Sequence, residues 1–137
     1  MKLEGGCFCG AVRYVAEGEP AMKGQCHCRQ CQHFAGGGPN IFIAMPAAGF
    51  SYTKGKPSAF ARDDAPVFKA EREFCPTCGV QLVTKAEPMP EVIFIKVGTL
   101  DDPAAFEGPH LAIFASDKQA FHQIPEGLPT FDKMPPM

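Results

Sequence analysis

Seven cysteines occur in three short clusters, and their spacing indicates metal binding. The clusters read CFC at 7–9, CHCRQC at 26–31 and CPTC at 75–78. An odd number of thiols cannot all pair within one chain, and clustered thiols in a reducing compartment are more often metal ligands or catalytic groups than disulfides. We therefore expect a bound metal, with disulfide bonds as the less favoured alternative.

Zinc is the ion that this pattern favours. Two residues between Cys75 and Cys78 let both sulfurs reach one ion at about 2.3 Å, and Gly79 permits the turn that follows them. Structural zinc takes four protein ligands, whereas catalytic zinc keeps one position for water or substrate. Seven thiolates divide naturally into four and three. We expect two zinc ions, one structural and one catalytic.

The seven thiols can be divided in two ways. In the favoured division the open, catalytic site consists of three residues within one tight loop, Cys26, Cys28 and Cys31. The closed, structural site then joins the N-terminal turn to the middle of the chain through Cys7, Cys9, Cys75 and Cys78. The alternative division leaves three cysteines unused and forms one ribbon-like site from Cys28, Cys31, Cys75 and Cys78.

The elements that position these thiols are expected to be short. Glycine and proline each number 14 in 137 residues, which leaves little room for long helices. Apolar and alternating runs predict strands at 11–16, 41–44, 58–61, 67–70, 80–84, 92–97 and 111–114. Two helical turns are expected, one capped by Asp102 ahead of Pro103 and one capped by Ser116. The pattern predicts a mainly β single domain with few short helices.

The chain is expected to form one domain with a C-terminal tail. Residues 1–124 contain all the cysteines and every predicted strand. Residues 125–137 contain four prolines, so this tail is expected to be extended, either against the domain or free.

Charge and hydropathy exclude several classes of partner. The net charge of -2 gives no electrostatic reason to expect nucleic acid or an anionic membrane. The sequence contains no apolar run long enough for a transmembrane helix, and its first residues lack the apolar segment of an export signal. We expect a cytoplasmic protein, and its oligomeric state stays open.

The cysteine motifs and their surroundings resemble the glutathione-dependent formaldehyde-activating family, also called the CENP-V/GFA domain. The resemblance rests on five stretches: GGCFCGAVRY at 5–14, CHCRQC at 26–31, FCPTCGVQL at 74–82, VGTLDDP at 97–103 and GPHLAIFASDKQAF at 108–121. It implies a β-tent fold of small antiparallel sheets around zinc sites, with the four-plus-three division of thiols given above. Two departures are the absence of tryptophan, with Phe121 where many relatives have one, and the glycine run at 36–38.

The activity that the resemblance implies is that of a carbon–sulfur lyase. Such an enzyme joins formaldehyde reversibly to glutathione and gives S-hydroxymethylglutathione, so the expected partner is a small thiol such as glutathione. A trio of thiolates with an open coordination position favours an enzyme, because a scaffold gains nothing from incomplete coordination. The alternative is a non-catalytic zinc-binding β scaffold for protein interaction.

Other polar residues are weaker candidates for the site. Histidine can move a proton or bind a metal, and His27 and His33 lie beside the proposed catalytic ligands, whereas His110 and His122 are expected at the surface or in the core. Guanidinium pairs well with carboxylates, so a substrate carboxylate could meet one of four arginines, namely Arg13, Arg29, Arg62 and Arg72. The glycine run at 36–38 is expected to be a flexible loop.

Overall fold

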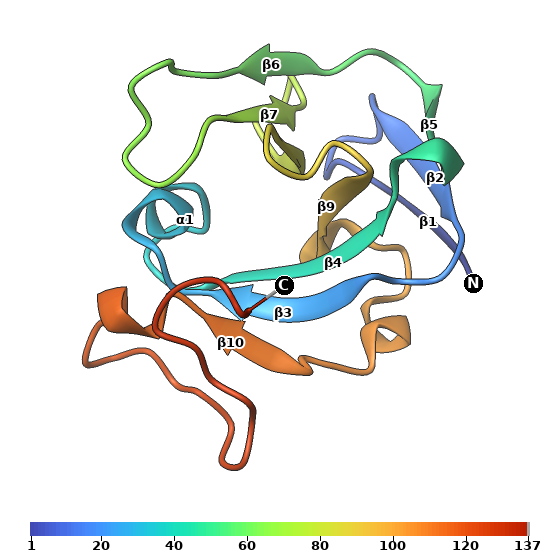
Figure 1. Ribbon diagram of the computed structural model, residues 1–137. Coiled ribbons are helices and arrows are strands. Elements are labelled where there is room, and N and C mark those ends of the chain that lie inside the picture. Colours follow the sequence, from blue (N-terminus) through green and yellow to red (C-terminus); the bar gives the residue numbers. More distant parts are fainter. Residues whose placement is uncertain (137) are drawn as a thin grey trace.

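The computed structural model describes residues 1–136, and their ten strands form two sheets (Figure 1). The smaller sheet is antiparallel, with the order β1 (Lys2–Gly6), β2 (Arg13–Glu17) and β5 (Phe50–Lys54). The larger sheet has the order β10 (Leu111–Ile113), β3 (Met22–Cys26), β4 (Asn40–Pro46), β9 (Val92–Lys96), β8 (Gln81–Ala86), β7 (Ala70–Phe74) and β6 (Ser58–Phe60). Its neighbouring strands are antiparallel, apart from the parallel pair β10 and β3. The predicted mainly β fold is confirmed.

The main core lies between the two sheets. β4 and β9 are adjacent at the centre of the larger sheet, where Ile43 pairs with Ile95 and both side chains are fully buried. Tyr14 of β2 packs against this core, stacks on Phe50 at 5.4 Å between ring centroids, and shares a hydrogen bond of 2.7 Å with Thr99. A second, smaller cluster of buried side chains surrounds the cysteines at the end of β3.

The helices are short, as the glycine and proline content predicted. Among the described residues the single α-helix is α1 (Arg29–Phe34), and four 3-10 helices follow: η1 (Ala47–Gly49), η2 (Val97–Thr99), η3 (Pro103–Phe106) and η4 (Ala115–Asp117). The Asp102 carboxylate caps η3 by accepting the Ala104 N–H at 3.2 Å, which confirms that prediction. The cap predicted at Ser116 is wrong, because Ser116 lies inside η4 and its hydroxyl donates to the Asp132 carbonyl instead.

Most predicted strands are present with boundaries shifted by one or two residues, but one is wrong. Residues 67–69 form no strand, and β7 begins only at Ala70. Val67 and Phe68 instead contact α1, where the Gln30 side chain donates to the Phe68 carbonyl at 3.2 Å and accepts the Val67 N–H. This contact attaches the connection between β6 and β7 to the helix (Figure 1).

The C-terminal tail runs along the edge of β10 (Figure 1). The Ala112 N–H donates to the Pro129 carbonyl at 2.9 Å, and the Phe131 N–H donates back to the Ala112 carbonyl at the same distance. Phe131 and Met134 pack against the smaller core cluster. Residues 129–134 therefore lie against β10 and the smaller core cluster, whereas residue 137 lies outside the described residues. No helix in residues 1–136 is long and apolar enough to cross a membrane.

Candidate metal centres

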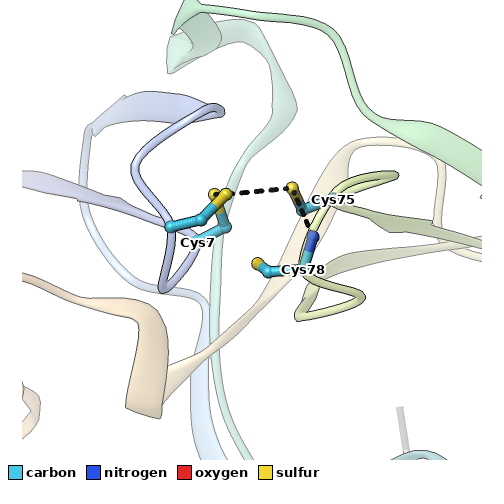
Figure 2. Close-up of side chains that lie close together, drawn as sticks. Cys7, Cys75 and Cys78 are labelled. Atoms are coloured by element: carbon cyan, nitrogen blue, oxygen red, sulfur yellow. Dashed lines mark hydrogen bonds between the residues drawn. The ribbon is translucent and has the colours of Figure 1, made fainter.

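Four of the seven cysteines form one cluster, which we call the four-cysteine cluster. Its sulfur atoms all lie within 4.8 Å of one another, and its members are Cys7, Cys9, Cys75 and Cys78. Figure 2 shows Cys7 facing Cys75 and Cys78 across the space between two loops. The Cys7 and Cys9 sulfurs are 3.6 Å apart, and the Cys9 and Cys75 sulfurs are 3.7 Å apart. Neither distance is a disulfide bond, because that bond is about 2.05 Å long.

Two similar turns build this cluster. After β1, the Cys7 N–H donates to the Val12 carbonyl and the Val12 N–H donates back to the Cys7 sulfur at 3.3 Å. After β7, the Cys75 N–H donates to the Val80 carbonyl, while the Cys75 sulfur accepts two backbone N–H groups at 3.3 and 3.4 Å. Glycines with φ near +80° close both turns, which is a backbone conformation that glycine adopts readily.

The geometry of the four-cysteine cluster fits a tetrahedral metal ion. Ligand sulfurs at about 2.3 Å from zinc lie about 3.8 Å apart in a tetrahedron. The two sulfur–sulfur distances given above are close to this value. Backbone N–H groups of Cys9 and Val80 lower the pKa of the Cys78 thiol to about 6, which favours the thiolate that a metal needs. Because Cys9 and Cys75 are 66 positions apart, an ion here would link the two sheets.

The other three cysteines form the three-cysteine cluster, whose sulfurs also lie within 4.8 Å of one another. Cys26 is the last residue of β3, Cys28 is the N-cap of α1, and Cys31 lies in the first turn of that helix. The Cys28 sulfur accepts the Cys31 N–H at 3.3 Å, so a thiol takes the place of the usual oxygen at this cap. The sequence did not predict α1, because six residues carry little periodic signal.

The thiol pKa values within the three-cysteine cluster shift in opposite directions. Hydrogen bonds from the Cys26 and Cys31 thiols lower the pKa of Cys28 to about 3, because they stabilise its thiolate. Contacts with Cys28 and Cys31, together with burial, raise the pKa of Cys26. A bound metal cation stabilises all three thiolates together, and three clustered sulfurs fit such an ion.

The structure brings the cysteines together in the favoured division. Cys75 and Cys78 lie with the N-terminal pair and not with Cys28 and Cys31, so the alternative ribbon-like division is not formed. All seven cysteines are free, so disulfide bonds do not occupy these positions. Either cluster could hold a metal ion.

A small cavity of about 40 Å³ opens beside the three-cysteine cluster. Cys26 and Cys31 form part of its wall, and Arg72 and Lys96 contribute its two cationic side chains. The rest of the wall is mainly apolar and comes from several elements, including Phe42, Phe68, Met89, Phe94, Ile113 and Met134. No member of the four-cysteine cluster lines this cavity.

The two cationic residues lie on neighbouring parts of the larger sheet. Lys96 ends β9, and its Nζ donates to Asn40 Oδ1 at 2.7 Å. Burial lowers the pKa of Lys96, the Cys31 thiolate raises it, and the positive charge of Arg72 lowers it. Arg72 lies in β7, with its guanidinium 4.2 Å from the centroid of the Phe34 ring. Sequence reasoning named Arg72 but missed Lys96.

Two of the four histidines form a buried pair behind the three-cysteine cluster. The Nδ1 atoms of His27 and His122 are 3.0 Å apart, and His122 Nε2 donates to the Gly37 carbonyl at 2.7 Å. The Nδ1 of His122 also accepts the Gln119 N–H at 3.3 Å, and His27 Nε2 contacts the Gln25 side chain at 2.8 Å. Burial lowers the pKa of His27 to about 4. His33 and His110 are exposed.

The remaining candidates have structural partners outside the cavity. Arg13 pairs with Asp101, Arg62 pairs with Asp64 at 2.8 Å, and Arg29 donates to Gln32. The glycine run is held by His122 through the Gly37 carbonyl, and Gly36 and Gly37 have φ angles of 77° and 108°. This loop thus has a defined contact with the buried histidine pair.

Comparison with known proteins agrees with the geometry. The family model described as "Glutathione-dependent formaldehyde-activating enzyme" matches residues 2–117. A Halomonas elongata protein named "Putative glutathione-dependent formaldehyde-activating enzyme" is 30% identical over 119 residues, covering 82% of this chain and 76% of that protein. The crystal structure of a Rhodobacter sphaeroides protein has the same fold, with a TM-score of 0.62 and 21% identity over 78% of this chain and 97% of that one. The chain belongs to the glutathione-dependent formaldehyde-activating enzyme family.

Proposed function

We propose that this protein is a zinc-dependent carbon–sulfur lyase that joins a small thiol reversibly to an aldehyde, with glutathione and formaldehyde as the first pair to test. The four-cysteine cluster would hold a structural zinc ion, and Cys26, Cys28 and Cys31 would hold a catalytic one. One observation carries the proposal: two members of the cluster with three sulfurs line a cavity. A tetrahedral ion with three protein ligands keeps one position for a substrate.

The chemistry divides between the ion and the chain. Bound zinc would supply a coordination position for a substrate sulfur and lower the pKa of that thiol. The Cys31 N–H fixes the Cys28 sulfur, and the end of β3 fixes that of Cys26. Aromatic side chains such as Phe42 and Phe94 line the cavity, so charges inside interact more strongly than they would in bulk solvent.

The buried histidine pair would position this loop and not act on the substrate. His27 faces His122 and the Gln25 side chain, so both of its ring nitrogens already have partners away from the cavity. The Gln32 side chain donates to the His27 carbonyl at 2.8 Å and adds a second support between the two ligands. These contacts hold the sulfurs in place before any substrate arrives.

Metal content and adduct formation test the proposal together. We expect two zinc ions per chain by elemental analysis, and faster formation of S-hydroxymethylglutathione from glutathione and formaldehyde, followed by NMR. The Cys28→Ser variant should lose one zinc and all turnover. Full activity in that variant would falsify the role of the three-cysteine cluster. Two zinc ions without adduct formation would reject glutathione and formaldehyde as the substrate pair.

The proposal extends to location and domain organisation. Seven free thiols suit a reducing compartment, which supports a cytoplasmic location. Residues 1–124 would form the zinc domain, and the tail from residue 125 would be an appended segment that covers part of it. Hydrogen bonds between the tail and Ala112 support this arrangement.

A further inference from the structure

The cavity beside the three-cysteine cluster contains positive charge without a balancing carboxylate. Arg72 is 7% exposed and Lys96 is partly buried, yet neither forms an ion pair with an aspartate or glutamate of residues 1–136. The residues that line the cavity include no carboxylate. Cations removed from water are usually paired, because removing a charge from water is costly. The chain's own acidic groups in the cavity are the thiols of Cys26 and Cys31, so a carboxylate that meets this pair has to come from a bound molecule.

Both side chains retain donors for such an anion. The Lys96 ammonium has three N–H groups, and the contact with Asn40 uses one. The Arg72 guanidinium has five N–H groups, and its carbon lies 4.2 Å from the centroid of the Phe34 ring, in a neighbouring hollow that Arg72 also lines. A guanidinium over an aromatic face can still donate hydrogen bonds from its edge. A carboxylate matches that edge, because it accepts two parallel hydrogen bonds from a guanidinium.

The charges of the metal centre do not cancel those of the cavity. A zinc ion with the three thiolates of Cys26, Cys28 and Cys31 has a formal charge of about -1. Arg72 and Lys96 together carry a charge of about +2. Before a substrate thiolate coordinates, the complete site therefore has an excess of about one positive charge, which attracts an anionic substrate.

The cavity is large enough for the anion. A volume of about 40 Å³ holds a few water molecules or a carboxylate group. Large apolar side chains line it, including Phe68 from the β6–β7 connection and Met134 from the tail.

We propose that this cavity is a subsite for one carboxylate group, bound by Arg72 and Lys96. The substrate of the three-cysteine cluster is then a thiol or aldehyde that carries that carboxylate. The identity of the reacting group rests on the proposed function, whereas the carboxylate subsite rests on the cavity alone. Its two cations are specificity-determining residues, because they distinguish an acid from a neutral molecule of the same shape.

Calorimetry on the zinc-loaded protein tests the subsite with matched probes. 3-Mercaptopropionate and 3-mercapto-1-propanol have the same chain length and thiol but differ in the carboxylate. We expect the acid to bind about tenfold or more tightly, the effect of a hydrogen bond to a charged group. Glyoxylate and propionate replace the thiol by an aldehyde or by no reacting group, so they identify which partner carries the carboxylate. Glutathione provides the comparison with a long substrate.

Two variants and one matched control connect the effect to its residues. Lys96→Met keeps the length of the side chain and removes its charge, and Arg72→Gln removes the guanidinium. Each should abolish the preference for the acid over the alcohol. Lys23→Met is the control, because Lys23 is also a partly buried lysine on a strand of the larger sheet, but it lines a different hollow. This control should retain the full preference.

The outcomes separate this inference from the proposed function. Equal affinity for acid and alcohol, or a preference that survives in Lys96→Met, overturns the subsite. So does glutathione binding that is tighter than that of 3-mercaptopropionate and unaffected by Lys96→Met. If neither thiol binds but propionate binds and loses affinity in Lys96→Met, the subsite stands and the thiol chemistry fails. If propionate and both thiols all fail to bind, the subsite is rejected.

Discussion

The two cysteine clusters differ in the parts of the chain that they join. The four-cysteine cluster links a turn after β1 in the smaller sheet to a turn after β7 in the larger sheet, across 66 positions of sequence. The three-cysteine cluster spans only residues 26–31, at one end of β3 and the start of α1. Closing a long loop restricts the unfolded chain far more than closing a short one.

The surroundings of the two clusters also differ. Backbone N–H groups contact the sulfurs of the four-cysteine cluster, and none of its members lines the cavity beside Cys26 and Cys31. The three-cysteine cluster forms the wall of a cavity that also contains Arg72 and Lys96. A site that joins distant segments supports the fold, whereas a local site beside a cavity can be changed without unfolding the chain. The number of thiols in a cluster therefore says less about its role than that number combined with the length of the loop that the cluster closes.

The largest expected effect is the loss of the four-cysteine cluster. Structural zinc contributes about 10–16 kcal/mol in small peptides, whereas whole domains are stable by only about 5–15 kcal/mol. Cys75→Ser, or removal of this ion by chelator, should therefore eliminate most of the folded structure. Far-UV circular dichroism measures the change. A spectrum that stays the same after complete zinc loss would contradict the structural role.

The matching change in the other cluster should affect chemistry and leave the fold intact. Cys28→Ser removes one ligand, so one zinc per chain and all turnover should be lost. The serine oxygen can still accept the Cys31 N–H at the N-cap, so α1 should persist. Elemental analysis and circular dichroism on the same sample give both results. Unfolding comparable to that of Cys75→Ser would remove the distinction between the clusters.

A third prediction concerns what holds the three-cysteine cluster in place. His122→Ala leaves the buried His27 Nδ1 without its partner, which costs about 1–3 kcal/mol. Urea unfolding should show this loss in the free energy of unfolding. Elemental analysis should show that the four-cysteine cluster keeps its zinc. His110→Ala is the control, because His110 is exposed and its replacement should change stability by less than about 0.5 kcal/mol. Equal losses of unfolding free energy in the two variants would indicate that the histidine pair does not stabilise the fold.

The smallest effect is expected at the ion pair beside the four-cysteine cluster. Arg13 donates to Asp101 at 2.8 Å through Nη1, and both side chains are partly exposed. Asp101→Asn should lower the free energy of unfolding by less than about 1 kcal/mol, and the loss should shrink in high salt. Thermal unfolding in low and high salt measures it. A loss approaching that of Cys75→Ser would mean that the turns, and not the ion, hold the two sheets together.

The cysteine clusters could be predicted from sequence because their chemistry depends on residue type and local spacing. Cys26, Cys28 and Cys31 are close whatever the fold, and the CPTCG turn at 75–79 has its own local geometry. Sequence also identified strands such as 92–97, since a continuous apolar run suits the middle of a sheet. The capped turn at Asp102 followed from the same local rules.

The cavity could not be predicted, because strand register brings its residues together. Lys96 pairs with Phe42 across β9 and β4, and Arg72 pairs with Thr84 across β7 and β8. Nothing in the sequence around either cation indicates these pairings. β7 was also missed, since a strand that reads AEREF resembles a solvent-exposed segment until Phe34 and other partners cover its charges.

The attachment of the tail to β10 has a consequence for how relatives diverge. The family match ends at residue 117, whereas Met134, well beyond it, lines the cavity. Substitutions in that segment can widen or narrow the cavity while every cysteine stays unchanged. Selectivity can therefore evolve separately from metal binding, and two relatives with identical cysteine motifs can accept molecules of different size.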